Sequence, residues 1–402
     1  MKKCWVARKL GAVSTKIGSG ATPLGGEEAY KVTGISLIRS LNVHDDGFRV
    51  AKLARIDDEQ AIRLSNVVVE PNDVLLNITG ASVARCCLAP EDLLPARVNQ
   101  HVSIIRPIKE KLDSAFLHYL LISKIYKDRL LNTGEEGGST RQALTKVQLQ
   151  EFIIEYPESL AEQQRIVGIL DEAFMGIATA KANAEKNLQN ARALFESHLQ
   201  SAFTQRGEGW TVRKIAEVAY HSLGKMLDKA KNKGKLQPYL RNINVRWFTF
   251  DLSVLLQMPF LPEESTKYTA VNGDVLICEG GYPGRAAIWA ENYPIYFQKA
   301  LHRVRFHEPM YNKWFVYYLY AQDKSGELKK HFSGTGIQHF TGEVLARFEL
   351  PLPPLPELRR AVAKFEELST ETQRLEALYL RRLAALEELK KSLLHQAFSG
   401  RL

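Results

Sequence analysis

The sequence lacks the motifs with which a chain of this size usually performs chemistry. It has no GxxxxGK[ST] loop for a nucleoside triphosphate, and neither Gly18-Ser19-Gly20 nor Gly280 to Gly284 has the spacing of a dinucleotide-binding loop. The only double proline, Pro353-Pro354, follows Leu352, so the Asn/Asp-Pro-Pro-aromatic stretch of an amino-methylase is absent, and so is a Gly-rich S-adenosylmethionine loop. No His pair has zinc spacing, and no acidic cluster suggests a two-metal nuclease. We therefore expect a chain that is not an enzyme and holds no cofactor or metal.

Cysteine is scarce and long apolar runs are absent. The four cysteines, Cys4, Cys86, Cys87 and Cys278, include no CxxC pair, which is typical of thiols in a reducing compartment. There is no apolar run of eighteen residues and no signal peptide, so we expect a soluble, cytoplasmic protein without a membrane partner. The net charge of +9, from 54 basic and 45 acidic residues, is compatible with a polyanionic partner but does not establish one.

Proline is also absent from residues 162–203 and 357–398, which are copies of one another. They align without a gap at a constant offset of 195, from Glu162/Glu357 to Phe203/Phe398. Both are rich in Ala, Leu, Glu, Lys, Arg and Gln, which favour helix. A coiled-coil seam is predicted at Leu375, Tyr379, Leu386, Leu389 and Leu393. Each stretch therefore predicts one long helix, and 42 residues of helix span about 63 Å.

The repeat extends beyond these helices. Trp5 to Leu10 returns as Trp210 to Ile215, and Asp73 to Leu76 returns as Asp274 to Ile277. The offset falls from 205 to 195 along the chain, as expected if short insertions lie in loops. Short β-branched segments and the amphipathic stretches 112–131 and 311–332 indicate mixed α and β units. The predicted segments are 1–158 and 208–353 for two globular units, and 159–207 and 354–402 for the helices that follow them.

Three stretches carry a resemblance to a known family. They are Gly-Ser-Thr-Arg-Gln-Ala-Leu-Thr (138–145), Tyr-Pro followed by Glu-Gln-Gln-Arg-Ile-Val (156–167), and the closing Ser-Leu-Leu-His-Gln-Ala-Phe-Ser-Gly-Arg-Leu (392–402). Together with the twofold repeat, they resemble the DNA-specificity subunit of Type I restriction–modification systems over essentially the whole chain. One departure is Arg359-Arg360-Ala361, which replaces the Gln-Gln-Arg-Ile of the first copy and affects only the start of the second helix.

The resemblance implies an α+β fold with two α/β target-recognition domains in tandem. Two long antiparallel coiled-coil helices would join them, with a pseudo-twofold axis. Each domain would read one half of an asymmetric bipartite site in double-stranded DNA, while the helices set the spacing and dock two methyltransferase subunits. Restriction subunits would complete an adenine-specific DNA methyltransferase and restriction endonuclease complex. S-adenosylmethionine, ATP and Mg are expected on those partners, and this chain would be its non-catalytic binding subunit.

Contacts with DNA are expected from polar, Gly-containing loops at matching positions of the two units. In the first unit the candidates are Thr79, Arg85, Asn99, Gln100, His101, Ser139, Thr140, Arg141 and Gln142; in the second they are Lys225, Arg241, Tyr282, Arg285, Lys299, His302, Arg303, Gln338 and His339. Arg can hold guanine and Asn or Gln adenine, whereas Lys and Ser more often hold phosphates. Residues that recur, such as Arg85/Arg285, could instead hold the domain together. The lysine-rich run 225–235 suits phosphate contact or a solvated loop.

Two other classes of function stay open from the residues alone. One is a coiled-coil adaptor that joins proteins and has no DNA role. The other is a methyltransferase or nuclease with unrecognised motifs. Turnover by the purified chain without a partner would favour the enzyme, and DNA footprinting together with a methyltransferase subunit would separate the adaptor.

Overall fold

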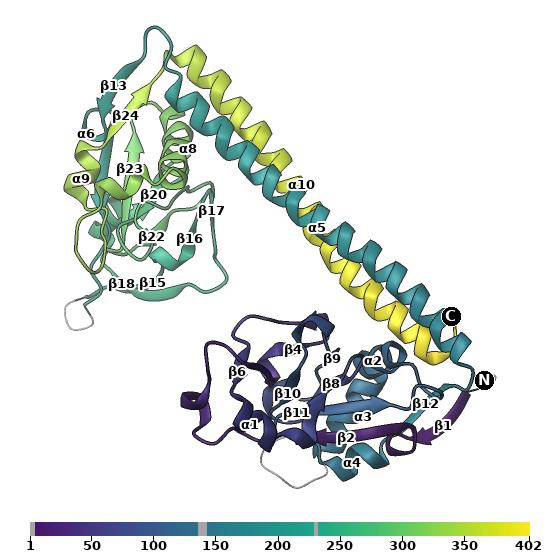
Figure 1. The fold of residues 1–402 in the computed structure, drawn as a ribbon. Helices are drawn as coiled ribbons and strands as arrows, with labels where there is room; N and C mark the ends of the chain where they lie inside the picture. Colours follow the sequence, from purple (N-terminus) through teal and green to yellow (C-terminus); the bar gives the residue numbers. More distant parts are fainter. Residues whose placement is uncertain (1–4, 136–142, 229–231) are drawn as a thin grey trace. The chain divides into compact units, whose positions relative to one another are not determined.

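The computed structural model describes residues 5–135, 143–228 and 232–402 (Figure 1). Contacts divide the chain into two compact units, unit 1 formed by Met1–Ala184 with Arg381–Leu402, and unit 2 formed by Glu185–Leu380. Each unit therefore holds one globular domain together with part of both long helices. The four segments predicted from the sequence divide the chain differently, because they separate each globular domain from the helix that follows it. These four boundaries stay a prediction.

The globular domain of unit 1 is built on two four-stranded sheets. The first has the order β2 (Ser14–Ser19), β11 (Val102–Pro107), β8 (Val74–Asn77), β9 (Cys86–Leu88) and is antiparallel; the second has the order β6 (Ala54–Ile56), β3 (Ile35–Ile38), β10 (Ala96–Val98), β7 (Val68–Val69), with β3 and β10 parallel. Two pairs complete it, β1 (Trp5–Lys9) with β12 (Ile153–Pro157), and β4 (Val43–His44) with β5 (Gly47–Phe48). The helices are α1 (Asp58–Arg63), α2 (Ser114–Ile122), α3 (Lys124–Glu135) and α4 (Lys146–Glu151).

Unit 2 repeats this pairing strand by strand, with every strand number raised by twelve. Its sheets are β14 (Ala219–Leu223), β23 (Leu301–Phe306), β20 (Val275–Cys278), β21 (Ala286–Ile288), and β18 (Leu256–Phe260), β15 (Lys235–Leu240), β22 (Ile295–Phe297), β19 (Thr269–Ala270). Its pairs are β13 (Thr211–Lys214) with β24 (Glu349–Leu352), and β16 (Val245–Arg246) with β17 (Thr249–Phe250). Its helices are α6 (Ile215–Val218), α7 (Ser265–Tyr268), α8 (Met310–Lys324) and α9 (Gly342–Arg347). The repeat read from the sequence is therefore a repeat of fold.

Two helices expected from the sequence are shorter than predicted. The stretch 112–131 contains α2 and α3 with a break at Ser123, whose backbone is extended and whose hydroxyl donates to Leu120 O at 2.6 Å. The stretch 311–332 contains α8, which ends before Gly326; this glycine has φ +80°, and a short 3₁₀ turn follows it. The apolar periodicity of the sequence continues through both breaks, because the residues on either side of each break belong to the same apolar face. The periodicity therefore predicted one helix in each stretch.

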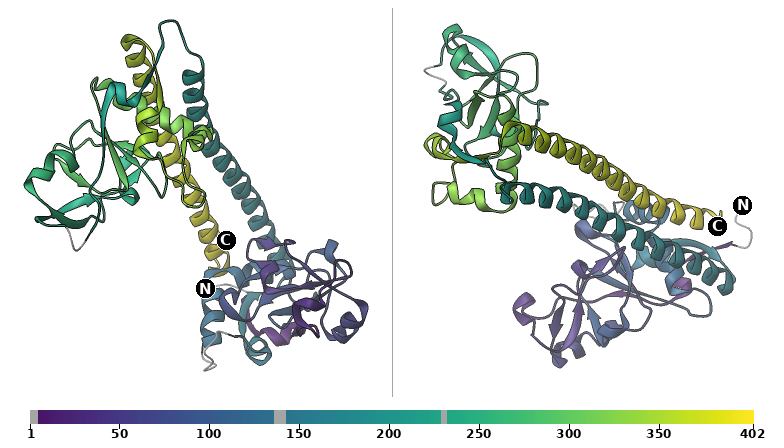
Figure 2. Two further views of the ribbon diagram at one scale, coloured as in Figure 1. Left: turned by 90° about the vertical axis from the view of Figure 1, so that its left-hand side faces the viewer. Right: turned by 90° about the horizontal axis from the view of Figure 1, so that it is seen from above.

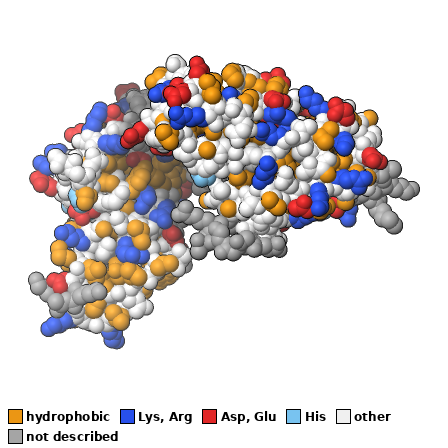
Figure 3. Space-filling model, turned by 60° about the horizontal axis from the view of Figure 1, so that its bottom comes forward, with side chains coloured by type: hydrophobic (Ala, Val, Ile, Leu, Met, Phe, Trp, Pro, Cys, Tyr) orange, Lys and Arg blue, Asp and Glu red, His pale blue; other side chains and the backbone are white. Residues whose placement is uncertain are grey.

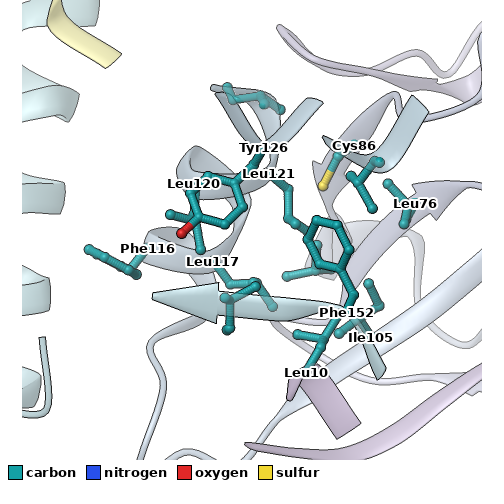
Figure 4. Close-up of a cluster of buried hydrophobic side chains, with 14 of the residues drawn as sticks. Leu10, Leu76, Cys86, Ile105, Phe116, Leu117, Leu120, Leu121, Tyr126 and Phe152 are labelled. Carbon is teal, nitrogen blue, oxygen red and sulfur yellow. The ribbon is translucent and has the colours of Figure 1, made fainter. Parts of the chain in front are cut away.

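The core of each unit includes side chains of the long helices. In unit 1, Leu10, Ile105 and Phe116 are fully buried beside the helix residue Phe398. Figure 4 shows part of this core, in which Phe116, Leu117, Leu120 and Leu121 of α2 belong to one cluster with the sheet residues Leu76 and Ile105. The helices are thus held by the same apolar burial that folds each domain.

The long helices are α5 (Leu160–Thr204) and α10 (Leu355–Ser399), 45 residues each. The Ser159 hydroxyl accepts from Glu162 N at 3.4 Å at the start of α5, while Pro356 lies in the first turn of α10, where its missing N–H costs no hydrogen bond. The predicted seam is wrong at Leu389, which is 47% exposed. No helix among the described residues is long and apolar enough to cross a membrane.

Within each unit the two helices run antiparallel (Figure 2). In unit 1 the Arg165 guanidinium donates to Leu402 O at 3.3 Å, while Lys181, further along α5, pairs with Glu387 at 2.6 Å. Unit 2 has the same sense, because Arg192 pairs with Glu376 at 2.8 Å while the Phe203 ring lies 5.7 Å from that of Phe365. Exposed ion pairs of this kind add little stability and mainly select the register.

A buried ion pair recurs in both domains. Arg106 donates from Nε and Nη2 to the two Asp73 oxygens at 2.7 and 2.9 Å, and Arg305 does the same to Asp274 at 2.7 and 2.7 Å. Both carboxylates are almost fully buried. The hydrogen bond to Asp73 raises the pKa of Arg106, and Asp274 raises that of Arg305. Recurrence at these positions reflects folding of the domain.

We expect Asp73→Asn to lower the free energy of unfolding of unit 1 by about 2 to 3 kcal/mol, because Arg106 loses its buried counter-charge and keeps only the exposed Glu70 as an acidic partner. Hydrogen exchange in β8 during urea titration measures the loss. Glu59→Gln, which breaks the exposed Arg63–Glu59 pair, is the control and should change stability by under about 0.5 kcal/mol. Equal effects of the two changes would contradict the structural role of the buried pair.

Candidate nucleic-acid interface

In unit 1, four of the predicted residues meet where β8 ends and β10 passes into β11. The Thr79 hydroxyl lies 2.6 Å from His101 Nδ1, and His101 Nε2 lies 2.9 Å from the Gln100 amide nitrogen. Asn99 Oδ1 accepts from His101 N at 3.0 Å and is itself buried. The donor and acceptor roles in these two contacts depend on the tautomer of the His101 ring. We call residues 79–85 with 99–101 the loop edge of unit 1.

The matching place in unit 2 has different chemistry. Gly280 and Gly281 follow β20, where a Cβ would lie 3.2 Å from His339 Nδ1 at the first and 2.4 Å from Asn242 Nδ2 at the second. Asn242 Nδ2 in turn donates to Gly280 O at 3.0 Å. A Cβ at Gly281 would force the Asn242 side chain to move, and the φ of +78° at Gly281 also favours glycine. We call residues 280–285, 298–300 and 338–339 the loop edge of unit 2.

A tyrosine and an arginine stand on this second edge. The Arg285 guanidinium donates to Asn242 O at 3.0 Å and lies 5.0 Å from the centre of the Tyr282 ring. Tyr282 is 42% exposed, and its hydroxyl donates to Asp323 at 3.0 Å. Arg285 therefore positions both the loop and the ring. This agrees with the alternative explanation that Arg85 and Arg285 recur because they hold the domain together. The sequence analysis did not select Asn242. A signal for it exists in the sequence, because Asn242 replaces Ser40 between two repeat stretches that are otherwise similar.

The predicted residues differ in accessibility. Lys299 and Gln338 are exposed, like Tyr282; Thr79, Arg85, Gln100, His101, Arg241, Arg285 and His339 are half-buried; Asn99, Lys225, His302 and Arg303 are buried. Ser139, Thr140, Arg141 and Gln142 lie outside the described residues. Thr79 and Ala143 form a backbone bridge, so Ala143 lies beside the loop edge of unit 1. No contact with DNA is tested by this placement, and the assignments stay predictions.

Three of the buried residues are engaged within unit 2. Lys225 Nζ donates to Pro259 O at 3.0 Å and pairs with Glu264 Oε2 at 2.5 Å. Arg303 Nη1 donates to Thr269 O at 2.6 Å. Burial lowers the pKa of His302 to about 4, so this ring is neutral near pH 7 and offers a phosphate no positive charge.

Charge does not single out an interface by itself. On the face shown in Figure 3, Lys and Arg side chains are interspersed with Asp and Glu over the part of the chain that the structure describes. In that same part, no three His, Cys, Asp or Glu side chains are grouped to hold a metal ion. The two loop edges are therefore distinguished by their converging hydrogen-bonding groups and by their position in the repeat.

Known proteins share both the sequence pattern and the fold. Residues 2–188 and 207–388 match the family model described as Type I restriction modification DNA specificity domain. A chain from a structure of "complex assembly and conformational transition of the type I R-M system" is similar with a TM-score of 0.77 and 18% identity, over 100% of this chain and 99% of that one. The HsdS subunit from Thermoanaerobacter tengcongensis has a TM-score of 0.65 and 20% identity, over 100% and 98%. At these identities the two structures support the fold.

The two lysines Lys225 and Lys299 should respond oppositely to substitution. Lys225→Gln should lower the free energy of unfolding of unit 2 by about 2 kcal/mol, because Glu264 loses its partner. Lys299→Gln should leave stability unchanged and reduce the salt slope of duplex binding by about one. Urea unfolding and fluorescence anisotropy with a labelled duplex measure the two effects. A reduced salt slope for Lys225→Gln with unchanged stability would reverse the assignment.

Proposed function

The chain belongs to the Type I restriction–modification DNA-specificity family, and from this premise we propose that its two domains read the two halves of one asymmetric bipartite DNA site. Specificity subunits of this family are non-catalytic, and the enzymatic activities lie on partner subunits. The proposal further assigns the spacing of the half-sites to α5 and α10, and it places the protein in the cytoplasm, where DNA is accessible. These assignments specify the roles of the two domains and of the two long helices in DNA recognition.

One observation carries the proposal. The same twelve-strand domain occurs twice, and its matching loop edges carry different side chains. Unit 1 presents Thr79, Gln100 and His101, whereas unit 2 presents Tyr282, Lys299 and His339. Hydroxyl, amide and imidazole groups read base edges, while lysine more often holds a phosphate. Two such surfaces of unlike chemistry suit two half-sites of unlike sequence.

The accessible members of each edge are the proposed contacts. In unit 1 the hydrogen-bonded order Gln100–His101–Thr79 fixes the side chains before DNA arrives, so little rotamer entropy is lost on binding. In unit 2 the ring of Tyr282 is held between Arg285 and Asp323. Asn99, Lys225, His302 and Arg303 are buried and lie outside this accessible set, whereas Ser139 to Gln142 remain proposed contacts by their place in the sequence.

Partners are proposed on the same basis. The relative with a TM-score of 0.77 comes from a structure that concerns complex assembly of the type I R-M system. We extend assembly of this kind to the present chain, with two methyltransferase subunits on the long helices and restriction subunits joining them. S-adenosylmethionine, ATP and Mg belong to those partners in the proposal.

Independent reading by the two domains can be tested with point substitutions. In the complex with its methyltransferase subunit, Gln100→Ala should lower methylation at sites that match the first half by about 10- to 100-fold, because one base contact is worth about 1–3 kcal/mol. It should relax specificity at one position of that half only. Methylome sequencing of cells carrying the variant measures both quantities.

The control for this experiment lies in the other domain. Gln338→Ala should alter only the second half of the site. If either variant changes both halves, the domains do not read independently. If neither variant changes a methylated sequence although the complex is active, these two residues are not contacts and the bipartite proposal stands on other residues of the same edges.

The helices should act as a ruler between the half-sites. Four residues inserted after Ala184, with four after Leu383 facing them, keep the buried seam nearly in phase and lengthen the pair by about 6 Å. We expect the gap in the methylated site to grow by one or two base pairs, since a base pair rises about 3.4 Å. Two-residue insertions at the same places rotate the seam by about 200° and should prevent assembly. An active enzyme with an unchanged gap would refute the ruler.

A further inference from the structure

Each unit has a groove bordered by its small hairpin, one domain helix and both long helices. In unit 1 the groove lies between the β4–β5 hairpin, α2, α5 and α10 and has a volume of about 960 Å³. In unit 2 the groove lies between the β16–β17 turn, α8, α5 and α10 and has about 330 Å³. The two grooves occupy the same place in the repeat, since Ile177 and Ala178 of the first correspond to Thr372 and Gln373 of the second at the offset of 195.

The smaller groove is filled by the chain itself. Trp247 and Phe248, at the tip of the hairpin, pack on Tyr320 with ring centres 5.2 and 5.0 Å apart. Phe248 also lies 5.1 Å from Tyr317. Below them the wall that α10 supplies is polar, with Thr372 and Gln373. Unit 2 therefore closes its own groove with two aromatic side chains.

In unit 1 the hairpin side of the groove is acidic and the facing long-helix wall is apolar, the reverse of the arrangement in unit 2. Asp45 and Asp46 occupy the positions of Trp247 and Phe248 at the offset of 202, and both line the groove. Asp45 accepts from Cys86 N at 3.1 Å and pairs with Lys127, while Asp46 pairs with Arg49 at 2.5 Å. The facing wall of α5 is apolar, yet no hairpin side chain of comparable size covers it in the described part of unit 1.

That wall consists of Phe174, Ile177 and Ala178 on α5. Phe174 is half-buried and packs on Tyr119 with ring centres 5.4 Å apart, Ile177 is half-buried, and Ala178 is exposed. Lys390 of α10 lies over the Phe174 ring at 5.1 Å. The groove thus combines an apolar wall, an acidic hairpin and a basic helix edge.

We propose that this groove receives an apolar side chain, on a loop or helix end, from the methyltransferase subunit bound beside unit 1. The proposal rests on the proposed function, which supplies that partner. The repeat shows that protein side chains fill the equivalent space in unit 2, and rims of both signs suit a polypeptide with charged residues on either side of its apolar anchor. The basic side chains of the rim, Arg85, Lys181, Lys390 and Lys391, can hold phosphates as well as carboxylates, but a duplex offers no apolar side chain to cover Phe174 and Ile177.

The proposal makes the two docking positions unequal. The partner beside unit 1 gains an anchor in a pre-formed groove, whereas Trp247 and Phe248 already occupy that space in unit 2. A buried apolar anchor in a pocket contributes strongly to affinity. The partner beside unit 1 is therefore the more tightly held, and substitutions in the groove affect that partner alone.

Matched substitutions at equivalent exposed positions test this. Ala178→Glu places a carboxylate on the apolar wall, and Gln373→Glu places the same group at the corresponding position of unit 2. Native mass spectrometry of the chain titrated with its methyltransferase subunit should show two bound subunits for the parent and for Gln373→Glu. Ala178→Glu should weaken one of the two steps by at least about 10-fold. Ala178→Trp, which fills the groove without adding charge, should have the same effect.

Each other outcome is informative. Two bound subunits at parental affinity for both Ala178 variants would overturn the proposal while leaving the proposed function intact. Equal weakening by Gln373→Glu would show a general effect on the helices and would also overturn it. Weakened duplex binding by the chain alone would assign the groove to DNA, and loss of a dimer of the chain would assign it to a second copy. A parent chain that binds no methyltransferase subunit would refute the proposed function itself.

Discussion

Everything in this protein depends on burying the side chains of two long helices inside two domain cores. In unit 1 the Phe398 ring of α10 lies 5.4 Å from Phe116 of α2, and in unit 2 the Phe203 ring of α5 lies 4.6 Å from Trp314 of α8. A helix of this length is marginal without tertiary contacts. Because apolar contacts rather than surface ion pairs hold the helices, each domain is fixed to a rigid element within its unit. This is the condition under which loop edges can present side chains in defined places.

Periodicity and repetition made most of this fold predictable. The proline-free stretches with offset 195 predict helices within one or two residues of their observed ends, and the aligned strands before them recur in the same pairing. The breaks at Ser123 and Gly326 were not predictable, because an apolar face continues across each break. Leu389 was misplaced in the seam because leucine spacing does not reveal which face the domain covers.

The candidate interface was less accessible to sequence reasoning. Thr79, Gln100 and His101 are three candidates from two loops that the structure brings together. Lys225, which the sequence suggests as a phosphate ligand, instead forms an ion pair with Glu264. A sequence shows that a residue is charged, but burial and pairing depend on contacts with distant segments. His302 illustrates the same limit, since burial lowers its pKa and its hydrogen-bond partner, the Phe340 carbonyl, is distant in the sequence.

An internal repeat separates structural from functional residues without any second protein. Where the two copies agree, as at Asp73/Asp274 and Arg106/Arg305, the side chains pair with one another inside each domain. Where the copies differ at one place in the fold, the shared architecture does not require the same residue in both, so the difference is free to serve binding. This holds at the loop edges, where Thr79 stands opposite Gly280, and at the grooves, where Asp45 stands opposite Trp247. The divergence of two otherwise matching halves thus points to surfaces at which each half meets a different environment.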